Sequence, residues 1–345
     1  MKSIRAQYVT GKRILVRCDF NVPVDDQLNI LDDFRIKRSL PTIEYLIKQD
    51  AKIILMSHLD PKETHVADHK FTLDNVAKKL SEYLFRPVEK ADNCIGQEVL
   101  EKTSSLNTGE VLLLENLRFH EGETKNSSEF AGQLAQLGDV YVNDAFSVCH
   151  RSHASIVQIP KILPSCAGLL LSQEIENLTK VLQNPKRPFI TIVGGVKVDT
   201  KAKFINRILK VADLVIVSGL IKKALMSKLR YRFSRKIVGP KDNLEAPDID
   251  EKAVNMLLEK IMQAKTVLWN GPFGKFEDKK YEYGTLAIAR GIIESKAFSV
   301  VGGGETVEFL NKEGLLPSFN WVSTGGGAML DYLSGDELPG LKALS

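Results

Sequence analysis

Arginine and histidine side chains follow short apolar runs at several points in the first half of the chain. Arg17 ends the first run, His58 and Arg118 each follow a later one, and Arg151 lies in a His-Arg-Ser-His stretch after a fourth. Arg35 follows a pair of aspartates. Guanidinium groups pair bidentately with carboxylate and phosphate oxygens, although a single arginine is more often a surface charge. Their repeated position after apolar runs favours a site for a small phosphorylated carboxylate.

Asp19 and Asn21 extend this group of polar residues. Together with Arg17 they alternate along the end of the first apolar run. Residues two apart on a strand point to the same face, so we expect all three side chains to lie on one side of a sheet. They are therefore assigned to the same predicted site.

Glycine-bearing segments follow four apolar runs in the second half. Glycine lets backbone N–H groups approach a phosphate, and a helix that follows adds its positive N-terminus. Taken alone, each segment is better explained as a tight turn that needs a positive φ. Four together favour phosphate binding, although none matches the P-loop or the GxGxxG pattern. They are Gly194-Gly195-Val196-Lys197, Trp269-Asn270-Gly271-Pro272, Gly302-Gly303-Gly304-Glu305-Thr306 and Ser323-Thr324-Gly325-Gly326-Gly327.

Lys197 and Lys201 follow the first glycine pair. Their four-residue spacing places both ammonium groups on one face of a helix that starts there. A lysine at a helix start opposes the helix dipole, which favours contact with an anion over simple solvation. Both lysines are therefore predicted to contact phosphate.

The apolar runs are predicted to be strands that alternate with helices. This alternation is typical of parallel sheets covered by helices on both faces, and two successive series indicate two α/β domains. The expected strands are Arg13–Arg17, Lys52–Met56, Val111–Leu114, Val140–Val142, Phe189–Val193, Leu214–Val217, Thr266–Trp269 and Ser299–Val301. The expected helices are Phe34–Lys48, Leu73–Leu84, Ser127–Leu137, Lys201–Val211 and Ala253–Ala264.

A connecting helix is predicted over Ser172–Asn184, where apolar residues recur at helical spacing before Pro185 and Pro188. Ligands of an open parallel sheet bind at the carboxyl ends of its strands. We therefore expect two three-layer α/β domains joined by a helix, with their sites facing each other across a cleft.

Composition narrows the class of protein. The chain has 345 residues, 43% of them hydrophobic and 26% charged, and a formal net charge of +4, which is too small and dispersed to indicate nucleic-acid binding. Its four cysteines show no CxxC spacing, so neither a disulfide framework nor a zinc site is expected. Neither a signal peptide nor a membrane span is evident, and a cytoplasmic protein is expected.

These segments resemble the phosphoglycerate kinase family along nearly the whole chain. The match includes Val16-Arg17-Cys18-Asp19-Phe20-Asn21-Val22-Pro23, Ser57-His58-Leu59, Glu115-Asn116-Leu117-Arg118-Phe119, Asn143-Asp144-Ala145-Phe146, the four glycine segments and the ending Gly335-Asp336-Glu337-Leu338-Pro339-Gly340. Their common order along the chain makes the resemblance specific.

The resemblance implies two Rossmann-like domains with a hinge, and a monomeric enzyme that uses Mg²⁺ with ATP or ADP. It would transfer a phosphoryl group reversibly between 1,3-bisphosphoglycerate and ADP, and 3-phosphoglycerate and ATP, in glycolysis and gluconeogenesis. The implied organisation is a phosphoglycerate domain over 1–171, the connecting helix over 172–184, a nucleotide domain over 185–325, and a C-terminal segment over 326–345 that packs back on the first domain.

The resemblance also implies roles for individual residues. Arg35, Lys201, Gly325 and Gly326 would act on the migrating phosphoryl group. The phosphoglycerate site would comprise Asp19, Asn21, Arg35, His58, Arg118 and Arg151. The nucleotide site would comprise Gly194, Gly195, Lys197, Lys201, Gly219, Asn270, Pro272, Glu277, Gly303, Gly304, Glu305 and Thr306, with Glu305 as the metal ligand.

The sequence departs from the family pattern at several of these positions. An arginine expected after Ser57-His58-Leu59 is absent, and Lys62 would stand in for it. Glu305 replaces the usual aspartate, Ser147 replaces a glycine, and the chain is shortened between Ile221 and Asp250. An alternative hypothesis is therefore a weak or inactive relative that binds anions or nucleotides and acts in regulation.

Overall fold

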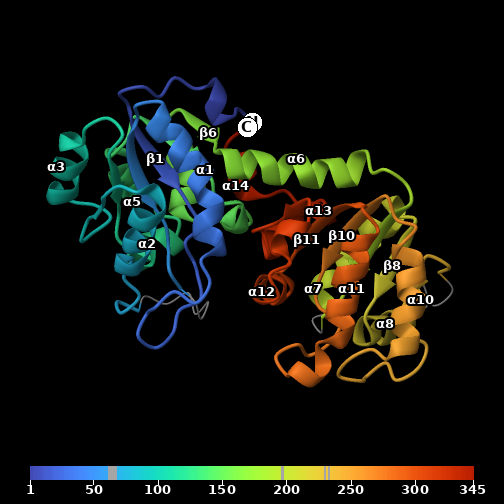
Figure 1. The fold of residues 1–345 in the computed structure, drawn as a ribbon. Coiled ribbons are helices and arrows are strands. Elements are labelled where there is room, and N and C mark those ends of the chain that lie inside the picture. The colour runs from blue at the N-terminus through green and yellow to red at the C-terminus, as the bar shows by residue number, and fades with distance from the viewer. Residues whose placement is uncertain (61–67, 196–197, 229–230, 232–233) are drawn as a thin grey trace. The chain divides into compact units, whose positions relative to one another are not determined.

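The chain forms two compact units. The computed structural model describes residues 1–60, 68–195, 198–228, 231 and 234–345. The first unit comprises Met1–Glu174 together with Glu337–Ser345, and the second comprises Ile175–Asp336. Helix α6 (Leu169–Gln183) runs through the boundary between them. Each unit is an α/β structure with its own parallel sheet (Figure 1).

In the first unit, the sheet has the strand order β3-β4-β2-β1-β5-β6 among the described residues. All neighbouring strands are parallel, and β1 pairs with β2 on one side and β5 on the other, so that Arg17 stands opposite both Met56 and Asn143. The strands are β1 (Arg13–Arg17), β2 (Lys52–Met56), β3 (Val88–Lys90), β4 (Val111–Leu113), β5 (Val140–Asn143) and β6 (Ser165–Ala167).

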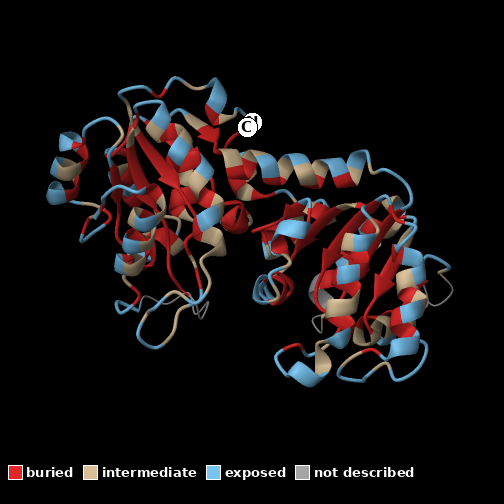
Figure 2. Ribbon diagram, viewed as in Figure 1, coloured by how far each residue is buried: buried red, intermediate tan, exposed pale blue. Residues whose placement is uncertain are grey.

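Helices surround this sheet. Strands β1, β2, β4 and β5 are apolar and almost wholly buried, as expected of strands covered on both faces, and the helices turn apolar stripes toward them (Figure 2). The helices are α1 (Phe34–Lys48), α2 (Asp74–Leu84), α3 (Gln97–Ser105), α4 (Glu121–Thr124), α5 (Ser128–Ala135) and α14 (Pro339–Lys342). Single helical turns lie at η1 (Ile4–Ala6), η2 (Leu117–Phe119), η3 (Phe146–Val148), η4 (Ala154–Gln158) and η5 (Ile159–Lys161).

The C-terminal residues belong to the first unit. The amide of Gly340 donates to the Cys149 carbonyl oxygen at 2.9 Å, and Ala343 packs on a small cluster that contains Val148 and Ile156. A side chain at position 340 would meet the Cys149 backbone at 2.9 Å, so the close approach requires glycine. Helix α14 is thereby attached beside the turn η3.

In the second unit, the described residues form a parallel sheet with the strand order β12-β11-β10-β7-β8-β9. Its strands are β7 (Phe189–Val193), β8 (Leu214–Val217), β9 (Ile237–Val238), β10 (Thr266–Asn270), β11 (Phe298–Gly302) and β12 (Trp321–Val322). Its helices are α7 (Val198–Val211), α8 (Gly219–Met226), α10 (Glu251–Ile261), α11 (Tyr283–Glu294), α12 (Gly304–Lys312) and α13 (Gly327–Ser334), with single turns η6 (Lys279–Tyr281) and η7 (Leu316–Ser318).

The expected pair of parallel α/β sheets is confirmed, with two local corrections. Strand β1 ends at Arg17, so the alternation argument for Asp19 and Asn21 is wrong: both lie in the loop that follows the strand. The connecting helix also begins at Leu169 rather than at Ser172. Among the described residues, no helix is long and apolar enough to cross a membrane.

Candidate functional site

Each sheet has a point where the chain reverses its direction of travel across the strands. In the first sheet this point lies between β1 and β5, and in the second between β7 and β10. The loops after adjacent strands leave in opposite directions there and open a crevice at the carboxyl ends of the strands. The polar residues predicted from the sequence follow these strands, so topology places two candidate sites, one in each unit.

In the first unit, Asp19 in the loop after β1 meets Arg35 in the first turn of α1. The Arg35 Nη1 atom lies 2.9 Å from Asp19 Oδ2 and donates to the Asn21 carbonyl oxygen at 3.0 Å. Asp19 Oδ1 accepts the backbone N–H of Asn21 at 3.0 Å, and Asn21 Oδ1 accepts the backbone N–H of Asp60 at 2.8 Å. Arg35, Asp19 and Asn21 therefore form one hydrogen-bonded group.

Ser147 completes the surroundings of the Asp19 carboxylate. It lies in η3 after β5, and its hydroxyl donates to Asp19 Oδ2. The loop after β5 thus contacts the loop after β1 across the reversal point of the sheet. In the sequence, Ser147 is marked only as a departure from the family's glycine, and its place in the site emerges from the fold.

His58 lies among arginines. Burial, together with the charges of Arg17, Arg118, Arg151 and Arg35, holds the pKa of His58 well below its ordinary value. Arg17 Nη2 lies 3.2 Å from His58 Nδ1. Four guanidinium groups act on one imidazole, so an anionic ligand at this position would meet favourable charge.

Arg118 is held by the loop after β4. Its backbone N–H donates to Asn116 Oδ1 at 3.0 Å, and Asn116 also accepts the N–H of Leu59 at 3.2 Å. Burial and the charges of Arg151 and Arg17 lower the pKa of Arg118. The predicted phosphoglycerate residues Asp19, Asn21, Arg35, His58, Arg118 and Arg151 therefore belong to one edge of one sheet.

In the second unit, the loops after β7 and β10 cross in direct contact. The N–H of Gly194 donates to the Asn270 carbonyl oxygen at 2.9 Å, and the N–H of Gly195 donates to the Pro272 carbonyl oxygen at 2.7 Å. A Cβ at Gly194 would lie 2.1 Å from the Pro272 oxygen and 2.3 Å from the Gly271 oxygen. Only glycine permits this crossing, which explains the glycines that follow both strands.

The same crossing holds Lys201 and Thr306. Lys201, in α7, is buried and donates from Nζ to the Gly194 carbonyl oxygen. Thr306 Oγ1, in the first turn of α12, accepts the N–H of Gly271 at 2.9 Å, and Asn270 Nδ2 donates to the Gly302 oxygen at 3.1 Å. The predicted residues Gly194, Asn270, Lys201 and Thr306 thus meet around one crossing, with Gly303 and Gly304 at the start of α12.

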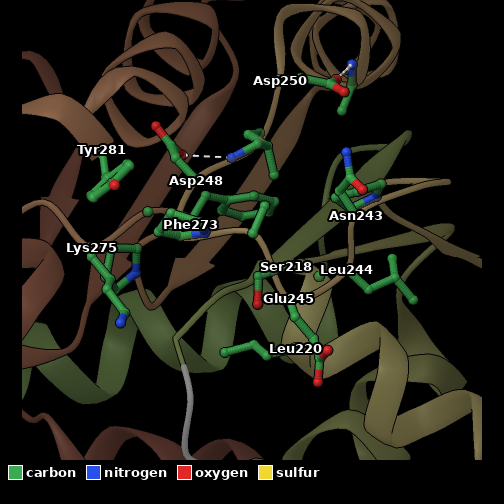
Figure 3. A pocket seen from close by; sticks show the side chains of 18 of the residues that line it. Ser218, Leu220, Asn243, Leu244, Glu245, Asp248, Asp250, Phe273, Lys275 and Tyr281 are labelled. Atoms are coloured by element: carbon green, nitrogen blue, oxygen red, sulfur yellow. Dashed lines mark hydrogen bonds between the residues drawn. The ribbon is translucent and has the colours of Figure 1, made fainter.

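A cavity of about 430 Å³ opens beside this crossing. Of the predicted nucleotide residues, Gly195, Gly219, Pro272, Glu277 and Glu305 line it. Another wall comes from Asp242–Asp250, part of the stretch that is shortened relative to the family (Figure 3). Asp248 fixes that wall, since its carboxylate accepts the N–H groups of Gly284 and Ile249 at 2.8 Å each.

Glu305 is an acidic residue in the first turn of α12, and it lines this cavity. A Cβ built on Gly195 would stand 3.9 Å from Glu305 Oε2 and 2.9 Å from Lys201 Nζ, so the carboxylate and the ammonium flank the same glycine. The described residues contain no cluster of three or more histidine, cysteine, aspartate or glutamate side chains able to enclose a metal. One carboxylate fits a metal that takes its other ligands from phosphates and water.

The remaining predicted residues lie apart from these contacts or outside the described residues. Gly325 and Gly326 stand between β12 and α13, and Gly325 N–H donates to Ser323 Oγ at 3.1 Å. Lys197 lies outside the described residues, as does Lys62. The contact of Arg17 with His58 was not predicted from the sequence, although Arg17 had been placed in the site from its position at the end of an apolar run.

Comparisons with known proteins agree along the chain. A family model described as phosphoglycerate kinase matches residues 4–245 and 227–336. The chain belongs to the phosphoglycerate kinase family. It is 39% identical to phosphoglycerate kinases of Aquifex aeolicus and Desulfosudis oleivorans, in alignments covering 99% and 100% of this chain and 98% of each relative.

Solved structures of phosphoglycerate kinases have the same fold. The enzyme of Pyrococcus horikoshii superposes with a TM-score of 0.88 at 32% identity, covering 100% of this chain and 98% of the other. The enzyme of Coxiella burnetii gives 0.81 at 31% identity, covering 99% and 98%. The resemblance drawn from the sequence is confirmed. Family membership supports phosphoglycerate kinase function, and nothing in these comparisons favours an inactive relative.

Proposed function

We propose that this chain is an active, monomeric, cytoplasmic phosphoglycerate kinase of glycolysis and gluconeogenesis. The γ-phosphoryl group of ATP passes to a carboxylate oxygen of 3-phosphoglycerate, giving 1,3-bisphosphoglycerate and ADP, and the reaction is reversible. The observation that carries the proposal is the group of arginines around His58 in the first unit, because the substrate carries both a carboxylate and a phosphate.

Asp19, Asn21, His58, Arg118 and Arg151 hold 3-phosphoglycerate. Guanidinium groups pair with its anionic oxygens, and a neutral imidazole donates a further hydrogen bond. Asp19 is buried and already fixed by Asn21 and Ser147, so it orients the substrate rather than the substrate orienting it.

The second unit holds the nucleotide in the cavity beside the glycine crossing. Backbone N–H groups and helix N-termini bind phosphates, and the cavity volume of about 430 Å³ suits a nucleotide. The proposed contacts are Gly194, Gly195, Lys197, Lys201, Gly219, Asn270, Pro272, Glu277, Gly303, Gly304 and Thr306. The wall at Asp242–Asp250 contacts the part of the nucleotide that the glycine segments do not bind.

Mg²⁺ fits this site through Glu305. One protein carboxylate together with phosphate oxygens and water is a usual environment for this ion. When bound, it neutralises charge on the nucleotide phosphates. Lys201 stands across Gly195 from this carboxylate, so a phosphate chain has both a metal ligand and a fixed ammonium within reach.

Arg35, Lys201 and the N–H groups of Gly325 and Gly326 stabilise the migrating phosphoryl group. Phosphoryl transfer depends mainly on positioning and on stabilising charge on the equatorial oxygens. Hinge closure between the two units is proposed to assemble these groups and to exclude water, which would otherwise hydrolyse the acyl phosphate.

The test is steady-state turnover of the purified chain with MgATP and 3-phosphoglycerate. Arg118→Ala should raise the KM for 3-phosphoglycerate roughly a hundredfold while leaving that for MgATP unchanged. Arg13→Ala is the matched control, because Arg13 starts the same strand that Arg17 ends and pairs with Asp139 at 2.7 Å. Folded wild-type protein that binds 3-phosphoglycerate but turns over with no nucleoside triphosphate would overturn the proposal and support an inactive relative.

A further inference from the structure

A buried chain of hydrogen bonds leads from Glu123 to His58. Glu123 (in α4) accepts from Ser155 (in η4), Ser155 accepts from Arg17 at the end of β1, and Arg17 contacts His58 after β2. Ser155 Oγ lies 2.6 Å from Glu123 Oε1, and Arg17 Nε lies 2.9 Å from Ser155 Oγ. Arg17 Nη2 lies 3.2 Å from His58 Nδ1.

The direction of every bond in this chain is determined. A carboxylate only accepts, so the single proton of the Ser155 hydroxyl points to Glu123 and leaves the lone pairs of Oγ to Arg17. A guanidinium only donates, so Nδ1 of His58 accepts from Arg17. A neutral imidazole with Nδ1 as acceptor carries its proton on Nε2.

Glu123 and Ser155 are held rigidly. The Ser155 backbone N–H donates to Glu123 Oε2 at 2.9 Å, so both carboxylate oxygens engage the same residue. Tyr141 donates its hydroxyl to the Ser155 carbonyl oxygen at 2.8 Å. Each side chain in the chain of bonds is at most 2% exposed. Water therefore offers no alternative partner, and the geometry is fixed by the protein.

The buried charges of Arg17 and Glu123 favour the same arrangement of hydrogen bonds. Arg17 is a buried cation, and Glu123 is a buried carboxylate two bonds away through one hydroxyl. Removing either partner would leave an uncompensated buried charge. The His153 ring also lies near, with Nδ1 3.9 Å from Glu123 Oε1. The carboxylate thus keeps Arg17 turned toward Ser155 and His58 rather than toward an incoming anion.

We propose that Glu123 and Ser155 are positioning residues that fix Arg17 against Nδ1 of His58, so that His58 is a neutral imidazole with its proton on Nε2 and donates to the anionic substrate. The last clause rests on the proposed function; the tautomer itself does not. The opposite tautomer would present a lone pair to an anion, which repels it. A merely structural Glu123 and Ser155 would stabilise the fold without determining where the imidazole proton sits.

The experiment measures the ring ¹⁵N chemical shifts of His58 in the free full chain, with His58→Gln to assign the signals. The wild type should show an unprotonated Nδ1 and a protonated Nε2. Ser155→Ala should shift both signals toward a mixture of tautomers, Ser155→Thr should restore the wild-type pattern, and Glu123→Gln should shift it in the same direction as Ser155→Ala. Wild-type shifts in a folded Ser155→Ala or Glu123→Gln protein would overturn the proposal.

Thr103→Val provides the matched control. Thr103 is a buried hydroxyl in α3 that donates to the Leu100 carbonyl oxygen of its own helix at 3.0 Å, so its loss should leave the His58 signals unchanged. A parallel titration with 3-phosphoglycerate separates the two proposals. Ser155→Ala should weaken its binding roughly tenfold. Absence of binding by the wild type would refute the proposed function while the ¹⁵N pattern still decides the role of Glu123 and Ser155.

Discussion

Arg35 Nη1 lies 2.9 Å from Asp19 Oδ2, and the two partners differ in exposure: the Asp19 side chain is 4% exposed and the Arg35 side chain 31%. Asp19 is fixed by donors from Asn21 and Ser147, whereas Arg35 reaches it from the first turn of α1. The ion pair therefore joins a buried, fixed carboxylate to a partly exposed guanidinium group. Arg35 can leave Asp19 to bind a phosphoryl group, because the Asp19 carboxylate keeps its hydrogen bonds from Asn21 and Ser147.

Asp19→Asn tests this anchor. The amide is uncharged and has one acceptor oxygen where the carboxylate has two, so at least one of the donors from Asn21, Arg35 and Ser147 loses its acceptor. We expect 3-phosphoglycerate binding to weaken by about 2–3 kcal/mol, in the range of a charged hydrogen bond, with nucleotide binding unchanged. Isothermal titration with each ligand is the measurement, and equal losses for both ligands would contradict the assignment.

Gly194→Ala tests the loop crossing in the second unit. The new Cβ would meet the Pro272 and Gly271 oxygens at 2.1 and 2.3 Å, and both are backbone atoms that cannot rotate away. We expect the free energy of unfolding of this unit to fall by about 3 kcal/mol or more, as measured by thermal and urea denaturation. Gly132→Ala in α5 is the control: a Cβ there meets nothing within 4 Å, so stability should rise slightly. Similar behaviour of the two variants would refute the crossing as a packing constraint.

Asp144 makes stability depend on pH. Burial raises the pKa of Asp144 from 3.8 to about 6, so the folded chain binds a proton that the unfolded chain releases between these values. This contribution is fully present below about 3.8 and is lost as pH rises through about 6. Asp144→Asn has no titrating group, so its melting temperature should improve relative to the wild type as pH rises from 4 to about 7. A difference between the two melting temperatures that stays constant with pH would contradict the shift.

Glu305→Gln tests the proposed metal ligand. The amide keeps the size but loses the charge that attracts Mg²⁺, so the Mg²⁺ concentration that gives half-maximal rate should rise roughly tenfold or more. Binding of 3-phosphoglycerate should not change. Glu308→Gln, an exposed glutamate on the same helix α12, is the control. An unchanged Mg²⁺ requirement in Glu305→Gln would remove Glu305 from the metal site.

The sequence predicted the central strands of both sheets and missed every edge strand. Strands β1, β2, β4, β5, β7, β8, β10 and β11 were expected, because buried parallel strands read as continuous apolar runs. The missed strands β3, β6, β9 and β12 are at most three residues long and lie at the sheet edges. Strand β4 is equally short, but it was recognised as part of a continuous apolar run, whereas the edge strands offer too few residues for such a pattern.

The candidate sites divide in a similar way. Arginines and glycines after strands could be recognised, because their types and positions point to anions. Arg17 could be placed in the site from its position at the end of an apolar run, but Ser155 and Glu123 could not, since their importance lies in contacts between residues more than thirty positions apart. The resemblance places the stretch from Ile221 to Asp250 around the adenine, but its shortening prevents a residue-by-residue alignment, so the cavity-lining residues Asp242–Asp250 could not be named from the sequence.

The most direct test of the central claim compares kcat in the wild type with Arg35→Ala and Lys201→Ala, while substrate binding is measured separately. If both side chains act on the migrating phosphoryl group, kcat should fall by roughly 10²–10³ in each variant, whereas the dissociation constants of 3-phosphoglycerate and MgATP change much less. Turnover that survives in both variants, or a loss that follows weakened binding alone, would contradict the account.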